Sequence, residues 1–118
     1  MSALDSCEIR LPDGRRWAVC ETASRFFARL RGLLGRPGLP EGHVLRILHC
    51  NAVHTVGMKF SLDLVFLSAD GRVTRIYRNV PPGRMFIGGG FRSTSVLEAE
   101  AGRVDLDAIP PGTPLAFR

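Results

Sequence analysis

The chain has 118 residues, 45% of them hydrophobic and 23% charged, which excludes a disordered chain and suffices for one domain with a single core. Its formal charge is +5, from 16 basic residues against 11 acidic ones, and this supports anionic partners without specifying one. We therefore expect a single domain over residues 1–118. We do not expect a nucleic acid partner, because none of the standard recognition motifs is present.

No stretch of the sequence has the pattern of a membrane segment. The apolar runs fall short of the roughly 20 residues that span a bilayer. Residues 1–14 have neither the basic region nor the apolar region of an export signal. We therefore expect a cytoplasmic protein without a membrane span.

Pro12, Asp13 and Gly14 predict a turn between the first two strands. Residues in this order favour a type I turn with glycine in the left-handed position, which closes a three-residue loop. In the register that this loop sets, Cys7 faces Val19 and the apolar side chains share one face. The sequence therefore predicts an amphipathic hairpin in this part of the chain.

The three cysteines are spread along the chain without a C-x-x-C pair, at Cys7, Cys20 and Cys50. An odd number at these spacings argues against a disulfide framework and against a zinc ribbon, so we expect free thiols. His49, Cys50 and His54 lie close in sequence, but their spacing matches no zinc signature. We therefore expect no metal and no cofactor.

After the hairpin, apolar residues recur at three- and four-residue spacing: Ala23, Phe26, Phe27, Leu30, Leu33 and Leu34. This period predicts an amphipathic helix from Ser24 to Gly35, and Pro37 reinforces the stop. The other face of this helix carries arginines, as a face in contact with solvent commonly does.

Residues 44–48 and 62–67 predict two strands, of which the second is apolar on both faces and therefore central. Asp70 and Gly71 then favour a hairpin turn. In the register of this turn three pairs of residues face each other: Leu67 with Val73, Val65 with Arg75, and Asp63 with Tyr77.

The pattern continues with a strand over residues 93–99, one helical turn over residues 104–109 and a last strand over residues 115–117. Short strands linked by hairpins are typical of bent sheets and barrels. We therefore expect an α+β fold: a compact, mainly antiparallel bent sheet or small barrel, with the one amphipathic helix packed on it.

Three blocks of the sequence resemble one known family. They comprise residues 29–36, then Val53, His54, Thr55, Met58, Leu62, Asp63, Phe66, Leu67, Gly71, Arg72 and Val73, then Val96, Leu97, Glu98 and Gly102. The chain is similar in these blocks to the domain of unknown function 192, a family of small bacterial and archaeal proteins. The resemblance implies a compact α+β domain and carries no agreed reaction, substrate or cofactor.

His54 opens the central block, where a histidine could shuttle protons, bind a ligand or hold backbone groups at a strand end. Asp63 and Glu98 are carboxylates inside apolar strands. A pair of acids in a cleft could act in acid/base catalysis, whereas a carboxylate between Arg75 and Tyr77 is a satisfied buried pair. We expect Asp63 to be mostly buried and hydrogen-bonded, with Arg75, Tyr77 or nearby backbone as its partner. We expect structural roles for both carboxylates, and no Gly-x-Ser-x-Gly elbow supports a nucleophile.

The segment from Pro81 to Ser93 has the composition of a loop. Its three glycines, Gly88 to Gly90, could form a nest of amides for an anion, and the flanking arginines would complement it. Its aromatic residues, Phe86 and Phe91, would favour a partner protein if they are exposed. The alternative without a binding role is a mobile surface loop.

These observations favour a binding module for a polar or anionic small ligand or for a partner protein that docks on the Pro81 to Ser93 loop. The expected ligand-binding residues are His54, Thr55, Lys59, Arg84 and Arg92. One alternative is a hydrolase-like enzyme that uses His54 with Asp63 or Glu98, so the sequence leaves open whether any reaction is catalysed. A second alternative is a structural assembly subunit.

Overall fold

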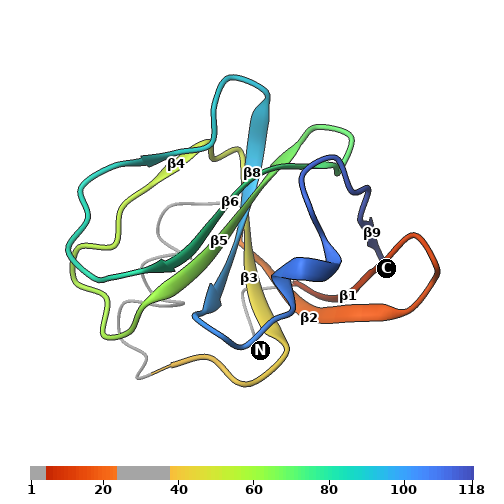
Figure 1. The fold of residues 1–118 in the computed structure, drawn as a ribbon, viewed down its shortest axis with the longest axis horizontal. Helices are drawn as coiled ribbons and strands as arrows, with labels where there is room; N and C mark the ends of the chain where they lie inside the picture. The colour runs from red at the N-terminus through yellow and green to blue at the C-terminus, as the bar shows by residue number, and fades with distance from the viewer. Residues whose placement is uncertain (1–4, 24–37) are drawn as a thin grey trace.

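The structure is a computed structural model that describes residues 5–23 and 38–118. Its main sheet has seven strands in the order β6-β5-β8-β3-β2-β1-β9 (Figure 1). In chain order their bounds are β1 (Asp5–Arg10), β2 (Arg16–Ala23), β3 (His43–Leu48), β5 (Leu62–Ser68), β6 (Val73–Val80), β8 (Ser93–Glu100) and β9 (Ala116–Phe117). A second sheet pairs β4 (Ala52–Val53) with β7 (Ile87–Gly88), and η2 (Leu106–Ala108) is a 3-10 helix.

The expected α+β class is wrong for the residues that the structure describes, which form strands and one 3-10 turn. The predicted helix from Ser24 to Gly35 lies outside the described residues. The large sheet is mixed, because β2 and β3 run parallel while its other pairings are antiparallel. A parallel pair needs a crossover of a dozen or more residues, and residues 24–42 supply it.

The sheet does not close into a barrel. In the described part of the chain, β6 and β9 are its outer strands, and a single isolated bridge between Arg72 and Pro114 connects the segment before β9 with the start of β6. This bridge and three backbone hydrogen bonds between residues 71–73 and 112–115 hold the two ends near each other without forming the continuous ladder that a barrel requires.

The first hairpin has the predicted turn but not the predicted register. The amide of Leu11 donates to the carbonyl of Arg15, and Gly14 has a φ of 91°, as expected for a three-residue loop. A bulge then places one extra residue, Trp17, in β2, so that Cys7 faces Cys20 and not Val19. A bulge of this kind shifts every later pair by one residue. All three cysteines are free thiols.

The second hairpin repeats this behaviour. Leu67 faces Val73 as the turn predicts, but a bulge follows, and Arg75 faces Phe66 while Tyr77 faces Leu64. Asp63 therefore does not face Tyr77. Its neighbours on β6 are the last residues of that strand.

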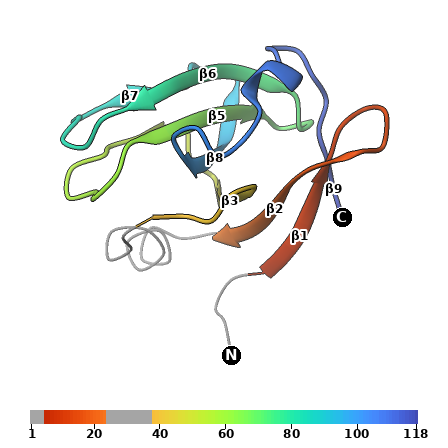
Figure 2. The same ribbon diagram turned by 60° about the horizontal axis from the view of Figure 1, so that its bottom comes forward.

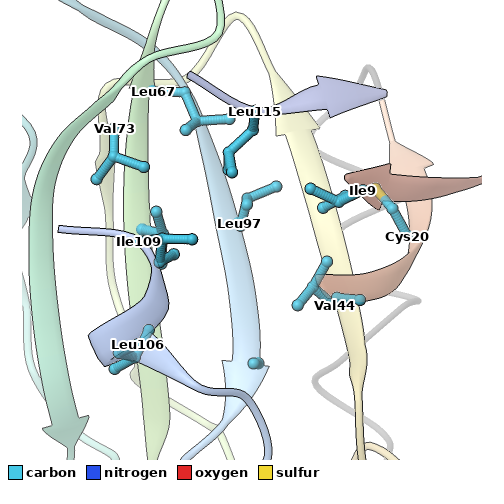
Figure 3. Close-up of a cluster of buried hydrophobic side chains, with 12 residues drawn as sticks. Ile9, Cys20, Val44, Leu67, Val73, Leu97, Leu106, Ile109 and Leu115 are labelled. Carbon is cyan, nitrogen blue, oxygen red and sulfur yellow. The ribbon is translucent and has the colours of Figure 1, made fainter. Parts of the chain in front are cut away.

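Two hydrophobic clusters lie on the two faces of the sheet. One contains residues of β1, β2, β3, β5, β6 and β8 and is covered by Leu106 and Ile109 at the 3-10 turn (Figure 3). The other includes Leu64, Phe66 and Val96 from the sheet, together with Val53 of β4 and Ile87 of β7. The small second sheet is thus anchored in the core by its inward-facing residues.

We refer to residues 51–60 and 81–92, which surround β4 and β7, as the arm. The arm lies at the opposite end of the molecule from β1, β2 and β9 (Figures 1 and 2). Residues 81–93 were expected to be a loop, but they contain strand β7, which pairs with β4. No helix among the described residues is long and apolar enough to cross a membrane.

Candidate functional site

Thr55 holds the two halves of the arm together. Its side chain is fully buried, and its Oγ1 donates to the carbonyl of Pro81 at 2.7 Å and accepts from the amide of Arg84 at 2.9 Å. Its own amide donates to the carbonyl of Arg84, and its carbonyl accepts from the amide of Gly83. Thr55 was predicted to bind ligand, but in this position it fixes the backbone of the segment that carries Arg84.

Three arginines around the arm have no carboxylate partner among the residues that the structure describes. In the part of the chain that the structure describes, the ion pairs involve Arg10, Arg15, Arg16, Arg72, Arg78 and Arg103. Arg75, Arg84 and Arg92 are exposed and belong to none of these pairs. Arg75 instead donates to the carbonyl of Gly88 and to the hydroxyl of Tyr77, and the Arg92 guanidinium lies 5.7 Å from the centre of the Phe91 ring.

Two of these arginines line one cavity of about 570 Å³ between the arm and β6. We call it the basic cavity; its walls include Asn51, Arg75, Tyr77, Arg84, Phe86 and Gly88. No aspartate or glutamate is among its described lining residues. The Tyr77 hydroxyl donates to the carbonyl of Gly88 at 2.7 Å, so β6 and β7 are tied together at the base of this cavity.

A second cavity of about 350 Å³ lies beside β4 and the end of β3. We call it the apolar cavity; its walls include Ile47, Leu48, Ala52, His54, Met85 and Phe86. His54 is partly buried in this wall. Ala52 and Phe86 line both cavities, so the two adjoin at the outer face of the arm.

The remaining predicted ligand residues lie apart from these two cavities. Lys59 is exposed on the turn before β5. Arg92 lines a further hollow of about 350 Å³ next to β6, which shares Arg75 and Gly90 with the basic cavity. The structure therefore places Arg84 and His54 in the walls of neighbouring cavities. Arg92 lines the hollow next to the basic cavity, and Lys59 lies outside the two cavities.

In the glycine run Gly88 to Gly90, which could have formed a nest of amides for an anion, the middle amide is already paired within the protein. The amide of Gly89 donates to the carbonyl of Asn51 at 2.8 Å as part of the small sheet. Gly89 also lies directly on the ring of Phe66, where a Cβ would come within 2.3 Å of Cδ1. Gly89 therefore permits a close approach of the arm to β5.

Asp63 is buried and accepts two backbone hydrogen bonds. Its carboxylate oxygens receive the amide of Asn79 at 2.8 Å and the amide of Gly102 at 3.0 Å. Asn79 has a positive φ of 52°, so the carboxylate supports an uncommon backbone conformation at the end of β6. Nearby backbone, and not Arg75 or Tyr77, satisfies this carboxylate.

The residues of the hydrolase-like alternative are not gathered in one cavity. His54 lines the apolar cavity, whereas Asp63 lines a separate hollow with Arg78 and Asn79. Glu98 is fully buried in β8, where it pairs with Leu45 on one side and Leu64 on the other. Among the described residues, no three His, Cys, Asp or Glu side chains are grouped as metal ligands would be.

Sequence reasoning missed Arg75, Tyr77 and Met85 as residues of the site. Arg75 and Tyr77 had been assigned to Asp63, because the expected register placed them beside it. The available signal was the charge pattern, since residues 72–96 contain five arginines and no acid. Such a stretch cannot neutralise its own arginines locally.

Comparisons with known proteins agree with the resemblance seen in the sequence. Residues 9–117 match the family model of the domain of unknown function 192, described as uncharacterized ACR. The chain is similar to a Sinorhizobium meliloti protein described as a proposed transcription regulator, with a TM-score of 0.81 and 24% identity over 99% of this chain and 97% of that one. It is also similar to a protein of unknown function from Novosphingobium aromaticivorans, with a TM-score of 0.75 and 23% identity over 96% of this chain and 84% of the other. At this identity the likenesses show the fold alone. None of the curated proteins matches the chain.

Proposed function

Because the chain belongs to the domain of unknown function 192 family, whose description assigns no activity, we infer its function from the site and propose that it is a binding module for small anionic ligands. The observation that carries this proposal is that three exposed arginines gather around the arm and have no carboxylate partner in the described part of the chain: Arg75, Arg84 and Arg92. Arginine binds carboxylates and phosphates through parallel hydrogen bonds, so arginines that the protein leaves unpaired suit an anion from outside.

The shape of the basic cavity supports the same proposal. Its volume of about 570 Å³ is in the range of small-molecule sites, which run from about 300 to 1,000 Å³. Arg75 is held by the Gly88 carbonyl, and the backbone of Arg84 is fixed by Thr55. Cations on a fixed backbone need little reordering when a ligand binds.

Thermal unfolding in the presence of phosphate, citrate and acetate, with glucose as the uncharged comparison, tests the proposal. A bound anion at a hundred times its dissociation constant should stabilise the protein by ~2.7 kcal/mol. Arg84→Ala should abolish this effect. The matched control is Arg78→Ala, because Arg78 is also exposed but pairs with Asp107 outside the cavity. Equal stabilisation of the parent and Arg84→Ala would contradict the proposal, as would no response to any anion.

A partner protein is the second candidate, and the exposure of large apolar side chains on the arm favours it: Val56 is 42% exposed, and three others are exposed further. Met85, Phe86 and Phe91 are 79%, 76% and 91% exposed. Apolar side chains left in solvent in one place often mark a protein interface. A complex that forms with the parent and Arg78→Ala, whose residue is exposed outside the arm, but not with Phe91→Ser would support this role. Cell fractionation would test the cytoplasmic location, which we retain as a prediction.

A further inference from the structure

We infer that the ligand of this site is an amphipathic carboxylate, with its apolar chain in the apolar cavity and its carboxylate at Arg84 and Arg75 in the basic cavity. This inference rests on the proposed function and adds the chemical class of the ligand. Its basis is that two cavities of opposite character adjoin at one exposed ring, Phe86.

The boundary between the two cavities is formed by Ala52 and by that ring, which line both of them. Ala52 of β4 pairs with Gly88 of β7. A Cβ on Gly88 would lie 3.0 Å from Cε1 of Phe86, so the missing side chain leaves room for the ring over the strand. The ring is 76% exposed, and it can therefore shift without disturbing the core. A narrow chain crossing from one cavity to the other would contact Ala52 below and Phe86 above.

The polarity of the walls decides which kind of molecule fits. The apolar cavity is lined by aliphatic, sulfur-containing and aromatic residues together with two histidines, His49 and His54, and none of its described lining residues is aspartate, glutamate, lysine or arginine. The basic cavity has two arginines and no described acid. A small polar anion would leave the first cavity unused, and a neutral hydrocarbon would leave the arginines unpaired. An acid with an apolar tail uses both.

The size of the apolar cavity limits the tail. About 350 Å³ is at the lower end of small-molecule sites, which begin near 300 Å³, so a medium-length chain fits better than a long lipid tail. Octanoate is therefore the probe of choice. Butanoate and hexanoate are the shorter members of the series, and octanol has the same chain without the charge.

Calorimetric titration of the full chain with these four compounds tests the inference. Affinity should rise about fourfold for each methylene added from butanoate to octanoate, the increment expected when a methylene leaves water. Octanol should bind at least tenfold more weakly than octanoate, because it cannot pair with the arginines.

Two substitutions separate the ends of the ligand. Arg84→Ala should reduce the affinity for octanoate to that for octanol. Met85→Gln should weaken octanoate several-fold and leave butanoate unchanged, because Met85 lines only the apolar one of the two cavities. Met85 is 79% exposed, so this variant should fold like the parent. Arg78→Ala and Val56→Gln are controls on surface positions outside both cavities and should bind octanoate as the parent does.

The outcomes that overturn the inference differ from those that overturn the proposed function. If butanoate and octanoate bind equally and both need Arg84, the amphipathic class is wrong while anion binding stands. Equal affinities for octanol and octanoate would likewise show that the carboxylate has no role. If octanoate binds unchanged to both Arg84→Ala and Met85→Gln, it binds elsewhere, and the inference fails. Absence of binding by every carboxylate and by inorganic phosphate would overturn both.

Discussion

The centre of the sheet and the arm at its end use charged residues in opposite ways. In β5, the buried Asp63 receives two backbone amides, so its charge is satisfied inside the protein. Around the arm, Arg75, Arg84 and Arg92 are exposed and have no carboxylate partner among the described residues. Asp63 belongs to the family pattern, and the three arginines belong to a stretch without acids, so both sets of residues look functional in the sequence. A charge that the chain itself satisfies supports the fold, whereas one left unpaired in a cavity suits an external partner.

The contact between the arm and β5 gives the prediction with the largest expected loss of stability. Gly89 lies on the fully buried ring of Phe66, and a Cβ there would come within 2.3 Å of Cδ1. Gly89→Ala should therefore lower the free energy of unfolding by about 2 to 3 kcal/mol, as overpacking of a core does. Urea denaturation measures this loss.

Gly83→Ala is the matched control for this prediction. Gly83 has a φ of +93° and no atom within 4 Å of its Cβ position, so alanine there suffers backbone strain of about 1 kcal/mol without a clash. If Gly89→Ala unfolds no earlier than Gly83→Ala, the arm does not pack on β5 as described.

The structural role assigned to Asp63 predicts a smaller loss. Asp63→Ala leaves the amides of Asn79 and Gly102 without their acceptor, which should cost about 2 kcal/mol. Asp63→Asn retains one acceptor oxygen and should cost less. Anion binding, measured below the melting temperature, should persist in both variants. A variant that melts like the parent but no longer binds anions would assign Asp63 to the site instead.

The sequence allows the turns of this fold to be predicted, but not its bulges. Pro12 to Gly14 and Asp70 to Gly71 both favour their observed turns through residues that accept the required backbone angles. Each hairpin then gains one extra residue on its second strand, at Trp17 and at Thr74. A bulge depends on packing against other strands, and nothing in the local sequence announces it. This is why Cys7 and Asp63 were given the wrong opposite neighbours.

The site was predictable in part, for a similar reason. The charge pattern pointed to Arg84 and Arg92, because no acid lies near them in sequence. Whether an arginine is paired depends on contacts between distant residues: Arg78 binds Asp107, which is 29 positions away. Strands β4 and β7 were both missed because each has only two residues, too short an alternation to detect. Without them neither cavity could be foreseen, because β4 lines both cavities and β7 lines the basic one.

Thr55 is buried and polar, as Asp63 is, but its hydrogen bonds fix the backbone of the arm. Thr55→Val preserves the shape but removes the Oγ1 contacts with Pro81 and with the amide of Arg84. We expect a loss of about 1.5 kcal/mol in unfolding free energy. Anion affinity should also fall, since the backbone of Arg84 is no longer fixed. Thr55→Ser should restore both. If the Thr55→Val variant is destabilised but binds anions normally, the Thr55 hydrogen bonds support the fold alone.

The smallest effect concerns the pH dependence of the sheet region. Burial raises the pKa of the Cys20 thiol from its ordinary value of 9.0 to about 12, and the facing Cys7 thiol adds to the rise. Since the pKa is higher in the folded protein, the unfolded chain loses this proton first. The stabilising contribution is therefore complete below pH 9 and is lost as the pH rises toward 12. At pH 10 the loss should be on the order of 1 kcal/mol.

Urea denaturation of the parent and of Cys20→Ala between pH 7 and roughly pH 10 measures this loss. The stability advantage of the parent should shrink above pH 9, and a constant advantage across this range would show that Cys20 is not protected from ionisation in the sheet.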